Sequence, residues 1–166
     1  MVAGAAAATI GVPAAAASES PSPSQERAAI RRATHSRTLW ATVNICNTRH
    51  HPDVIGLRGQ MPALGFPAAQ EMTVRLFYWN FKRSRFELIQ GVEQRLSLGT
   101  ITHGTVQAGA EFRFKPPVIL SGEITFRWYR EGRLLASITR LTSHGDRGVN
   151  DSDPPGYSTA TCRMGE

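Results

Sequence analysis

The chain has 166 residues, of which 41% are hydrophobic and 19% charged, and its formal net charge is +6. This size and composition favour a packed globular core and exclude more than one domain of ordinary size. The positive charge permits attraction to anionic partners, such as envelope polymers, but it identifies none of them.

Residues 1–17 carry no charge and consist mostly of Ala, Gly and Val. Small residues at positions 14–18 suit a signal peptidase, so we predict an export signal at residues 1–17, although a positively charged segment before it is missing. The alternatives are a membrane anchor and a flexible Ala-rich tail. A bilayer-spanning helix requires about 20 apolar residues, and this stretch is shorter and contains Pro13. We therefore expect a secreted or envelope-associated protein with no spanning membrane segment.

Residues 18–37 begin with a Ser/Pro-rich linker and continue with a basic stretch that contains Arg27, Arg31, Arg32 and Arg37. Apolar residues do not recur on one helical face of this stretch, so a solvated, mostly disordered arm is predicted in preference to a helix. The rest of the chain, residues 38–166, is predicted to form a single β-domain.

Alternation of apolar and polar residues begins at Leu39 and is the pattern of a half-buried strand up to Ile45. Residues 50–69 contain several Gly and Pro residues and are predicted to form a loop. Further strands are predicted at residues 72–79, 86–90, 96–101, 106–114, 124–129, 134–138 and 157–162. Seven or eight short strands with turn signals between them predict an all-β, antiparallel sandwich, and a partly closed β-barrel is the alternative.

Residues 126–135 read FRWYREGRLL, in which a strand with a central Trp turns through Glu131 and Gly132. This stretch resembles the central hairpin of immunoglobulin-like domains, and the chain resembles small exported bacterial proteins with immunoglobulin-like sandwiches. The resemblance implies that Trp128 packs between the sheets. Unlike antibody-type domains, the chain has no Cys a dozen or so residues before this Trp. The predicted core residues are Trp128, Phe126, Val74 and Leu76.

The only cysteines are Cys46, which ends the first predicted strand, and Cys162, which ends the last one. An even pair behind an export signal predicts one disulfide bond that joins these two strands. Two unpaired buried cysteines are the alternative. The disulfide also predicts that the domain works outside the cytoplasm.

Residues 75–86 interleave five aromatic and four basic side chains without an acidic one. Aromatic rings and cations together hold sugar faces or single strands of nucleic acid, and export argues against nucleic acid. Alternating aromatic residues on a hairpin usually belong to the core while the arginines face water, and we expect this here; the alternative is a surface that binds an anionic or carbohydrate envelope polymer. The candidate binding residues are Phe77, Trp79, Phe81, Lys82, Arg83 and Arg85.

The loop at residues 146–153 is rich in side-chain oxygen atoms, which calcium prefers as ligands. Its spacing does not match the helix–loop–helix calcium pattern, and Asp, Asn, Gly and Pro are also ordinary turn residues. We therefore predict no metal site, and we interpret His50, His51 and Asp53 as part of a solvated loop. If a cation did bind, the ligands would be Asp146, Asn150, Asp151 and Asp153.

Catalytic motifs are absent from the sequence: it has no Gly-x-Ser-x-Gly elbow, no Gly-rich phosphate loop and no Cys beside a plausible base. The sequence therefore predicts a binding or structural module without a cofactor or an enzymatic activity, whose partner is an envelope polymer or another protein. A hydrolase with dispersed carboxylates is the alternative. Its candidate residues would be Glu87, Glu93, Glu111 and Glu123.

Overall fold

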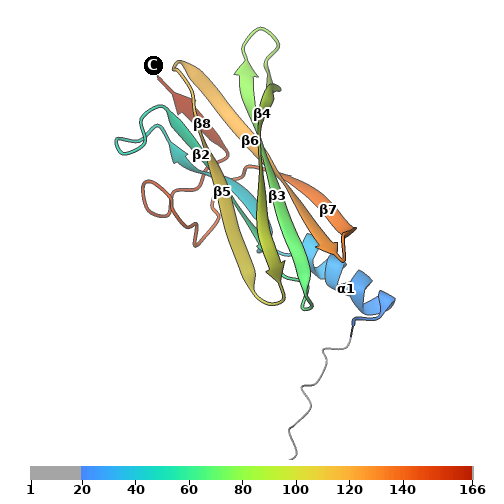
Figure 1. Cartoon of the computed structure of the whole chain (residues 1–166). Helices are drawn as coiled ribbons and strands as arrows, with labels where there is room; N and C mark the ends of the chain where they lie inside the picture. The colour runs from blue at the N-terminus through green and yellow to red at the C-terminus, as the bar shows by residue number, and fades with distance from the viewer. Residues whose placement is uncertain (1–19, 166) are drawn as a thin grey trace, which may run out of the picture.

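The computed structural model describes residues 20–165, so the predicted export signal at residues 1–17 lies outside the described residues. Within that range, one helix precedes eight strands (Figure 1). In chain order the elements are α1 (Pro23–Thr34), β1 (Trp40–Cys46), β2 (Val54–Pro62), β3 (Ala68–Asn80), β4 (Arg85–Ile101), β5 (Thr105–Arg113), β6 (Val118–Arg130), β7 (Arg133–Leu141) and β8 (Thr161–Met164).

The strands form two antiparallel sheets. Sheet A has the strand order β1-β2-β5, and sheet B has the order β4-β3-β6-β7, with β8 also pairing with β6. Because the strands divide between two sheets and do not form one continuous sheet, the prediction of an all-β sandwich is confirmed and no closed barrel forms.

The core lies between the two sheets, and the residues predicted for it are fully buried. Val74 and Leu76 on β3, and Phe126 and Trp128 on β6, each have an exposed fraction of 0%. The indole N–H of Trp128 donates a hydrogen bond to the carbonyl oxygen of Pro62 on β2, at 2.9 Å. Trp128 therefore reaches from sheet B to sheet A with its polar group paired.

The predicted loop at residues 50–69 contains β2, so this prediction is wrong for residues 54–62. Its glycines allow other groups to approach the strand closely. A Cβ atom added at Gly59 would lie 2.9 Å from Ile124 and 3.0 Å from Phe126, and one added at Gly56 would lie 2.8 Å from Asn44 Oδ1. Glycine within a strand often marks such an approach and was here mistaken for a turn signal.

The strands predicted at residues 86–90 and 96–101 are parts of one longer strand, β4, which pairs with β3 along most of its length. The pairing register shifts between Arg75 and Phe77. Beside this shift, Gly91 has a φ of 74°, which side-chain-bearing residues rarely adopt. The β3–β4 hairpin projects beyond the neighbouring strands at one end of the sandwich (Figure 1).

Helix α1 lies in the stretch predicted to be a disordered arm, so that prediction is wrong for residues 23–34. Ser22 and Gln25 form a reciprocal capping box at the start of the helix, a signal that the Ser/Pro-rich composition concealed. Only the small side chains of Ala29 and Ala33 are buried, which explains the weak apolar periodicity. In the described part of the chain, no helix is long and apolar enough to cross a membrane.

The predicted disulfide between Cys46 and Cys162 is present, with Cα atoms 5.3 Å apart. A register shift between Val43 and Ile45 brings Cys46 opposite Ile55, whose side chain faces the core. Cys162 lies on β8, which belongs to sheet B. The bond therefore joins the two sheets, and the first and last strands are not neighbours within one sheet as the sequence suggested.

The segment between β7 and β8, residues 142–160, covers the free edge of β1; we call it the covering segment. Its backbone bonds to β1 at three points: Ser143 N–H donates to Ala41 O, Val43 N–H to Thr159 O, and Asp153 N–H to Asn44 O. These bonds are 2.8–2.9 Å long. The segment thereby protects an edge strand that would otherwise expose unpaired backbone groups.

Candidate functional site

The tip of the β3–β4 hairpin, residues 79–87, carries most of the predicted binding residues; we call it the hairpin tip. Phe81 is 72% exposed, and the rings of Trp79 and Phe86 pack edge to face with centroids 5.1 Å apart. Phe77 lies outside the tip, half-buried on β3 opposite Leu88. The structure thus gathers the predicted residues other than Phe77 at one projecting end.

Glu87 organises the basic side chains of the hairpin tip; the sequence indicated it only as one of four dispersed carboxylates, not in this role. Its Oε1 accepts hydrogen bonds from Arg83 Nη1 at 2.9 Å and from Arg85 Nε at 3.1 Å. Its Oε2 accepts from the Tyr78 hydroxyl at 3.0 Å and from Asn80 Nδ2 at 2.9 Å. The acid-free stretch ends one residue before Glu87, whereas strand pairing places Glu87 directly opposite Tyr78.

These contacts keep Glu87 ionised. The hydrogen bond from Asn80, followed by those from Arg83, Tyr78 and Arg85, lowers the pKa of Glu87 to about 2, against the opposing effect of burial. The side-chain oxygen of Asn80 also accepts from the backbone N–H groups of Lys82 and Arg83, which shapes the turn. The tip thus holds three cations, of which Arg83 and Arg85 pair with Glu87, and it keeps an excess of positive charge.

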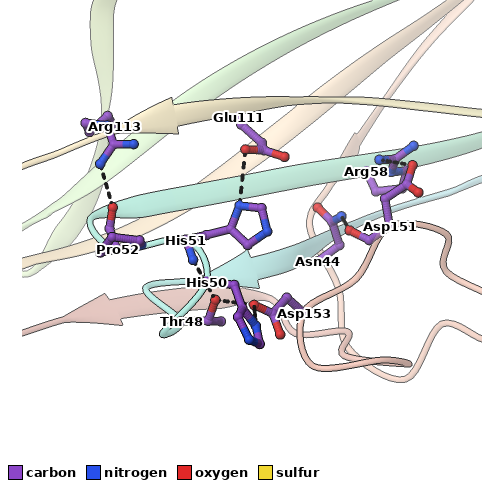
Figure 2. A network of polar contacts seen from close by, with 10 residues as sticks. All are labelled: Asn44, Thr48, His50, His51, Pro52, Arg58, Glu111, Arg113, Asp151 and Asp153. Carbon is purple, nitrogen blue, oxygen red and sulfur yellow. Dashed lines mark hydrogen bonds and ion pairs between the residues drawn. The ribbon is translucent and has the colours of Figure 1, made fainter.

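A second polar region lies on the outer face of sheet A, where the loop between β1 and β2 meets the covering segment (Figure 2). His50 Nδ1 lies 3.2 Å from Asp153 Oδ2, and the Thr48 hydroxyl donates to the same oxygen. His51 Nδ1 lies 3.6 Å from Glu111 Oε2 on β5. The two histidines predicted to lie in a solvated loop therefore contact different carboxylates.

The oxygen-bearing side chains of residues 146–153 do not form a common site. Asp151 pairs with Arg58 at 2.8 Å, whereas Asp153 contacts Thr48 and His50. Burial raises the pKa of Asp146, which accepts a hydrogen bond from the Ser143 hydroxyl. Asn150 donates its backbone N–H to Gln107. Throughout residues 20–165, no group of three or more His, Cys, Asp or Glu side chains could hold a metal ion.

A cavity of about 340 Å³ lies beside this network; we call it the sheet A hollow. Two of the residues that line it, Asn44 and Arg58, each carry one buried atom, Oδ1 and Nε respectively, that has no hydrogen-bond partner among the described residues. Asn44 is only 2% exposed. Almost all buried polar groups in proteins are paired, so two unpaired buried atoms on neighbouring strands are unusual. The hollow also includes Gln94, Gly109 and Glu111.

The carboxylates that a hydrolase would use lie beside basic side chains. Arg75 contacts Glu123, and strand pairing places Glu93 on the other side of Arg75. Glu87 pairs with Arg83 and Arg85, as described above, and Glu111 lies near His51. Each of these glutamates therefore has a basic neighbour, and Glu93 and Glu123 share Arg75.

No protein-family model matches the chain, and neither a curated protein nor a solved structure matches it. The resemblance of residues 126–135 to immunoglobulin-like domains accordingly stays a prediction.

Proposed function

We propose that this protein is an exported, non-enzymatic binding module that holds an anionic carbohydrate polymer of the cell envelope through the hairpin tip. The observation that carries the proposal is the projecting tip, where Phe81 is 72% exposed among Lys82, Arg83 and Arg85. Aromatic side chains and arginines are enriched at binding interfaces, and an exposed apolar group on a projecting segment often marks one.

The basic side chains are arranged to contact anions. Arg83 and Arg85 share one oxygen of Glu87, yet their side chains are 62% and 63% exposed. Each contact uses one nitrogen, so the remaining N–H groups of each guanidinium are free to bind carboxylate, sulfate or phosphate groups. Lys82 adds a charge that forms no ion pair within residues 20–165. Glu87 thus holds two arginines in place without neutralising the tip.

The aromatic side chains add a surface that suits sugars. A sugar ring has an apolar C–H face, which packs against aromatic rings. Phe81 and the Trp79–Phe86 pair provide such rings next to the cations. A polymer with both sugar rings and negative charges would contact both groups at once.

The proposed location agrees with the disulfide bond. Such bonds persist in oxidising compartments and are rare in the cytosol, so the bond between Cys46 and Cys162 is compatible with an extracellular site. The proposal includes the export signal expected at residues 1–17 and the immunoglobulin-like relationship expected from residues 126–135.

Retention on an acidic polysaccharide tests the proposal. We expect the protein to bind alginate beads at low salt and to elute at high salt, because the contacts between exposed charges are screened. Phe81→Ala and Lys82→Ala should each reduce retention several-fold. Lys115→Ala, which removes the only other lysine, also exposed, should not. Absence of low-salt retention on both alginate and isolated cell-wall material rejects the proposal.

A second variant tests the role of Glu87. Glu87→Gln makes the tip more positive but removes the carboxylate that fixes both arginines, so we expect weaker retention despite the gain in charge. Glu93→Gln, an exposed change on the same strand with the same charge effect, is the control. Stronger retention of the Glu87 variant than of the control would show that charge alone determines binding.

A further inference from the structure

Helix α1 turns its basic side chains away from the sandwich. The buried side chains of the helix are Ala29 and Ala33, which pack against the core. Residues four positions apart are neighbours on a helix surface, so Arg27 and Arg31 form a pair on the side opposite these alanines. Arg32 flanks this pair, and all three arginines are exposed. The side of α1 that faces solvent is therefore basic.

The acidic side chains near α1 contact arginines of sheet B. Glu26 is the only acidic residue of α1. Its side chain is 13% exposed and lies 2.9 Å from Arg133 Nη2 and 3.7 Å from Arg130 Nη1. Glu131, in the turn between β6 and β7, lies 3.8 Å from Arg130 Nε. Within residues 20–165, no ion pair involves an arginine of α1, so no acidic side chain offsets their charge.

Contacts at both ends hold α1 against sheet B. Near the start of the helix, Arg133 Nη2 donates to both carboxylate oxygens of Glu26, at 2.9 Å each. At its end, Arg140 Nη2 donates to the carbonyl oxygen of Thr34 at 2.8 Å. The arginines of α1 therefore project from a helix with a fixed orientation, and they can meet one flat surface together.

The exposed side of α1 differs in chemistry from the hairpin tip. No large hydrophobic side chain of α1 is exposed, so the helix offers no aromatic ring to a sugar and no apolar stripe to insert into a bilayer. A guanidinium group can bind a phosphate group through two parallel N–H bonds. These arginines thus suit a surface dense in phosphate groups, such as the headgroups of anionic phospholipids.

The position of α1 favours a membrane surface over a second contact with the envelope polymer. Figure 1 shows α1 and the hairpin tip at opposite ends of the molecule. Only residues 18–22 separate α1 from the uncharged, mostly apolar residues 1–17. With α1 lying on a bilayer, the hairpin tip would point away from the lipid, toward the polymer.

We propose that α1 docks the folded domain on an anionic phospholipid surface through Arg27, Arg31 and Arg32. A basic residue close to such a surface strengthens binding roughly five-fold, so three of them give a preference on the order of 100-fold for anionic over neutral membranes. The hairpin tip takes no part in this contact and stays free for its own ligand.

Co-sedimentation of the full chain with lipid vesicles tests this docking. Vesicles of phosphatidylglycerol and phosphatidylcholine in equal parts should bind the protein at low salt and release it at high salt, because exposed charges are screened. Vesicles of phosphatidylcholine alone should bind it far less. Absence of binding to the anionic vesicles at low salt, or equal binding to both kinds of vesicle, overturns the proposal.

A triple variant tests the assignment to α1. Arg27→Gln, Arg31→Gln and Arg32→Gln together remove three charges, and glutamine has a helix propensity close to that of arginine. We expect binding to the anionic vesicles to fall at least ten-fold, with an unchanged melting temperature as evidence that the variant is folded. Undiminished vesicle binding by the folded variant contradicts the assignment.

The control variant removes the same charge from the hairpin tip, by Lys82→Gln, Arg83→Gln and Arg85→Gln. Vesicle binding should change less than two-fold in this variant, whereas its retention on alginate should fall more than that of the α1 variant. Equal losses of vesicle binding in both variants would mean that net charge alone determines it, and would overturn the proposal. Failure of membrane docking and failure of the hairpin-tip proposal therefore give different results.

Discussion

The polar and charged side chains on the outer faces of the two sheets find their partners in different ways. On sheet B the face is open and polar, and its charged side chains pair across strands. Arg75 contacts Glu123, and Glu71 lies 3.1 Å from Arg127 and 3.6 Å from Arg95. Strand register alone places these partners opposite or diagonal to one another, so the pairing repeats from strand to strand.

On sheet A the covering segment crosses the face and supplies the partners. It meets Gln107 on β5, Arg58 on β2 and Asn44 on β1. An irregular segment cannot match every group on a regular sheet, and here it leaves Asn44 Oδ1 and Arg58 Nε unpaired. The comparison shows that regular strand pairing matches the charges on sheet B, whereas an irregular segment leaves buried polar atoms unpaired on sheet A.

The largest expected effect concerns the bond that joins the two sheets. Replacing both Cys46 and Cys162 by Ala should lower the free energy of unfolding by about 4–5 kcal/mol, because the disulfide closes a loop between positions 116 apart. Urea unfolding of the variant and of the oxidised protein measures the difference. A loss below about 1 kcal/mol would show that noncovalent packing between the sheets is sufficient.

The next effect compares the two faces directly. Asp151→Asn should destabilise the chain by about 1–3 kcal/mol, because the Arg58 side chain, only 16% exposed, loses its charged partner. Glu71→Gln on sheet B is the matched change; Arg127 keeps a hydrogen bond to Thr73, so we expect about 1 kcal/mol or less. Urea unfolding again provides the measurement. A larger loss of unfolding free energy for Glu71→Gln than for Asp151→Asn would contradict this contrast between the two faces.

Helix α1 gives a smaller effect at the end of sheet B. Ser22→Ala removes the capping box and should cost about 1 kcal/mol, provided that α1 remains docked on the sandwich through the contact of Glu26 with Arg133 at 2.9 Å. Thermal unfolding of Ser22→Ala and of the control Ser20→Ala, an exposed change before the helix, measures it. Equal melting temperatures would mean that the helix adds nothing to the stability of the sandwich.

The smallest expected effect is the loss of stability when Asp153, in the covering segment, is protonated at low pH. The hydrogen bond from Thr48, followed by the contact with His50, lowers the pKa of Asp153 below 3.8, against the opposing effect of burial. This contact therefore stabilises the fold above pH 3.8 and is lost as the pH falls below that value. NMR of the carboxyl carbon should show the low midpoint, and Thr48→Val should raise it. An unchanged midpoint in that variant would assign the shift to another group.

Several features followed from the sequence because they depend on local patterns. Alternating residues report which side chains share one side of a strand, and this put Phe126 and Trp128 on the same face; the resemblance to an immunoglobulin-like hairpin implied that Trp128 packs between the sheets. The turn at Glu131 and Gly132, where both residues have positive φ, is equally local. The two cysteines were paired because no other partner existed in the chain.

Other features depended on contacts between distant residues. Strand β2 was missed because its glycines allow other groups to approach the strand closely. In a sequence, such glycines look the same as glycines that form a turn. The role of Glu87 at the hairpin tip was missed because it comes from pairing with Tyr78 across the hairpin. The sheet A hollow was missed because its lining residues come from separate strands.

The sequence by itself determined an all-β chain with a disulfide and a basic, aromatic hairpin, since periodicity and composition are properties of neighbouring residues. Only the tertiary structure decided that the disulfide joins the two sheets, that Glu87 positions two arginines and that Asn44 and Arg58 line one cavity. These depend on strand register and on how an irregular segment packs, and both are set by the free energy of the whole fold.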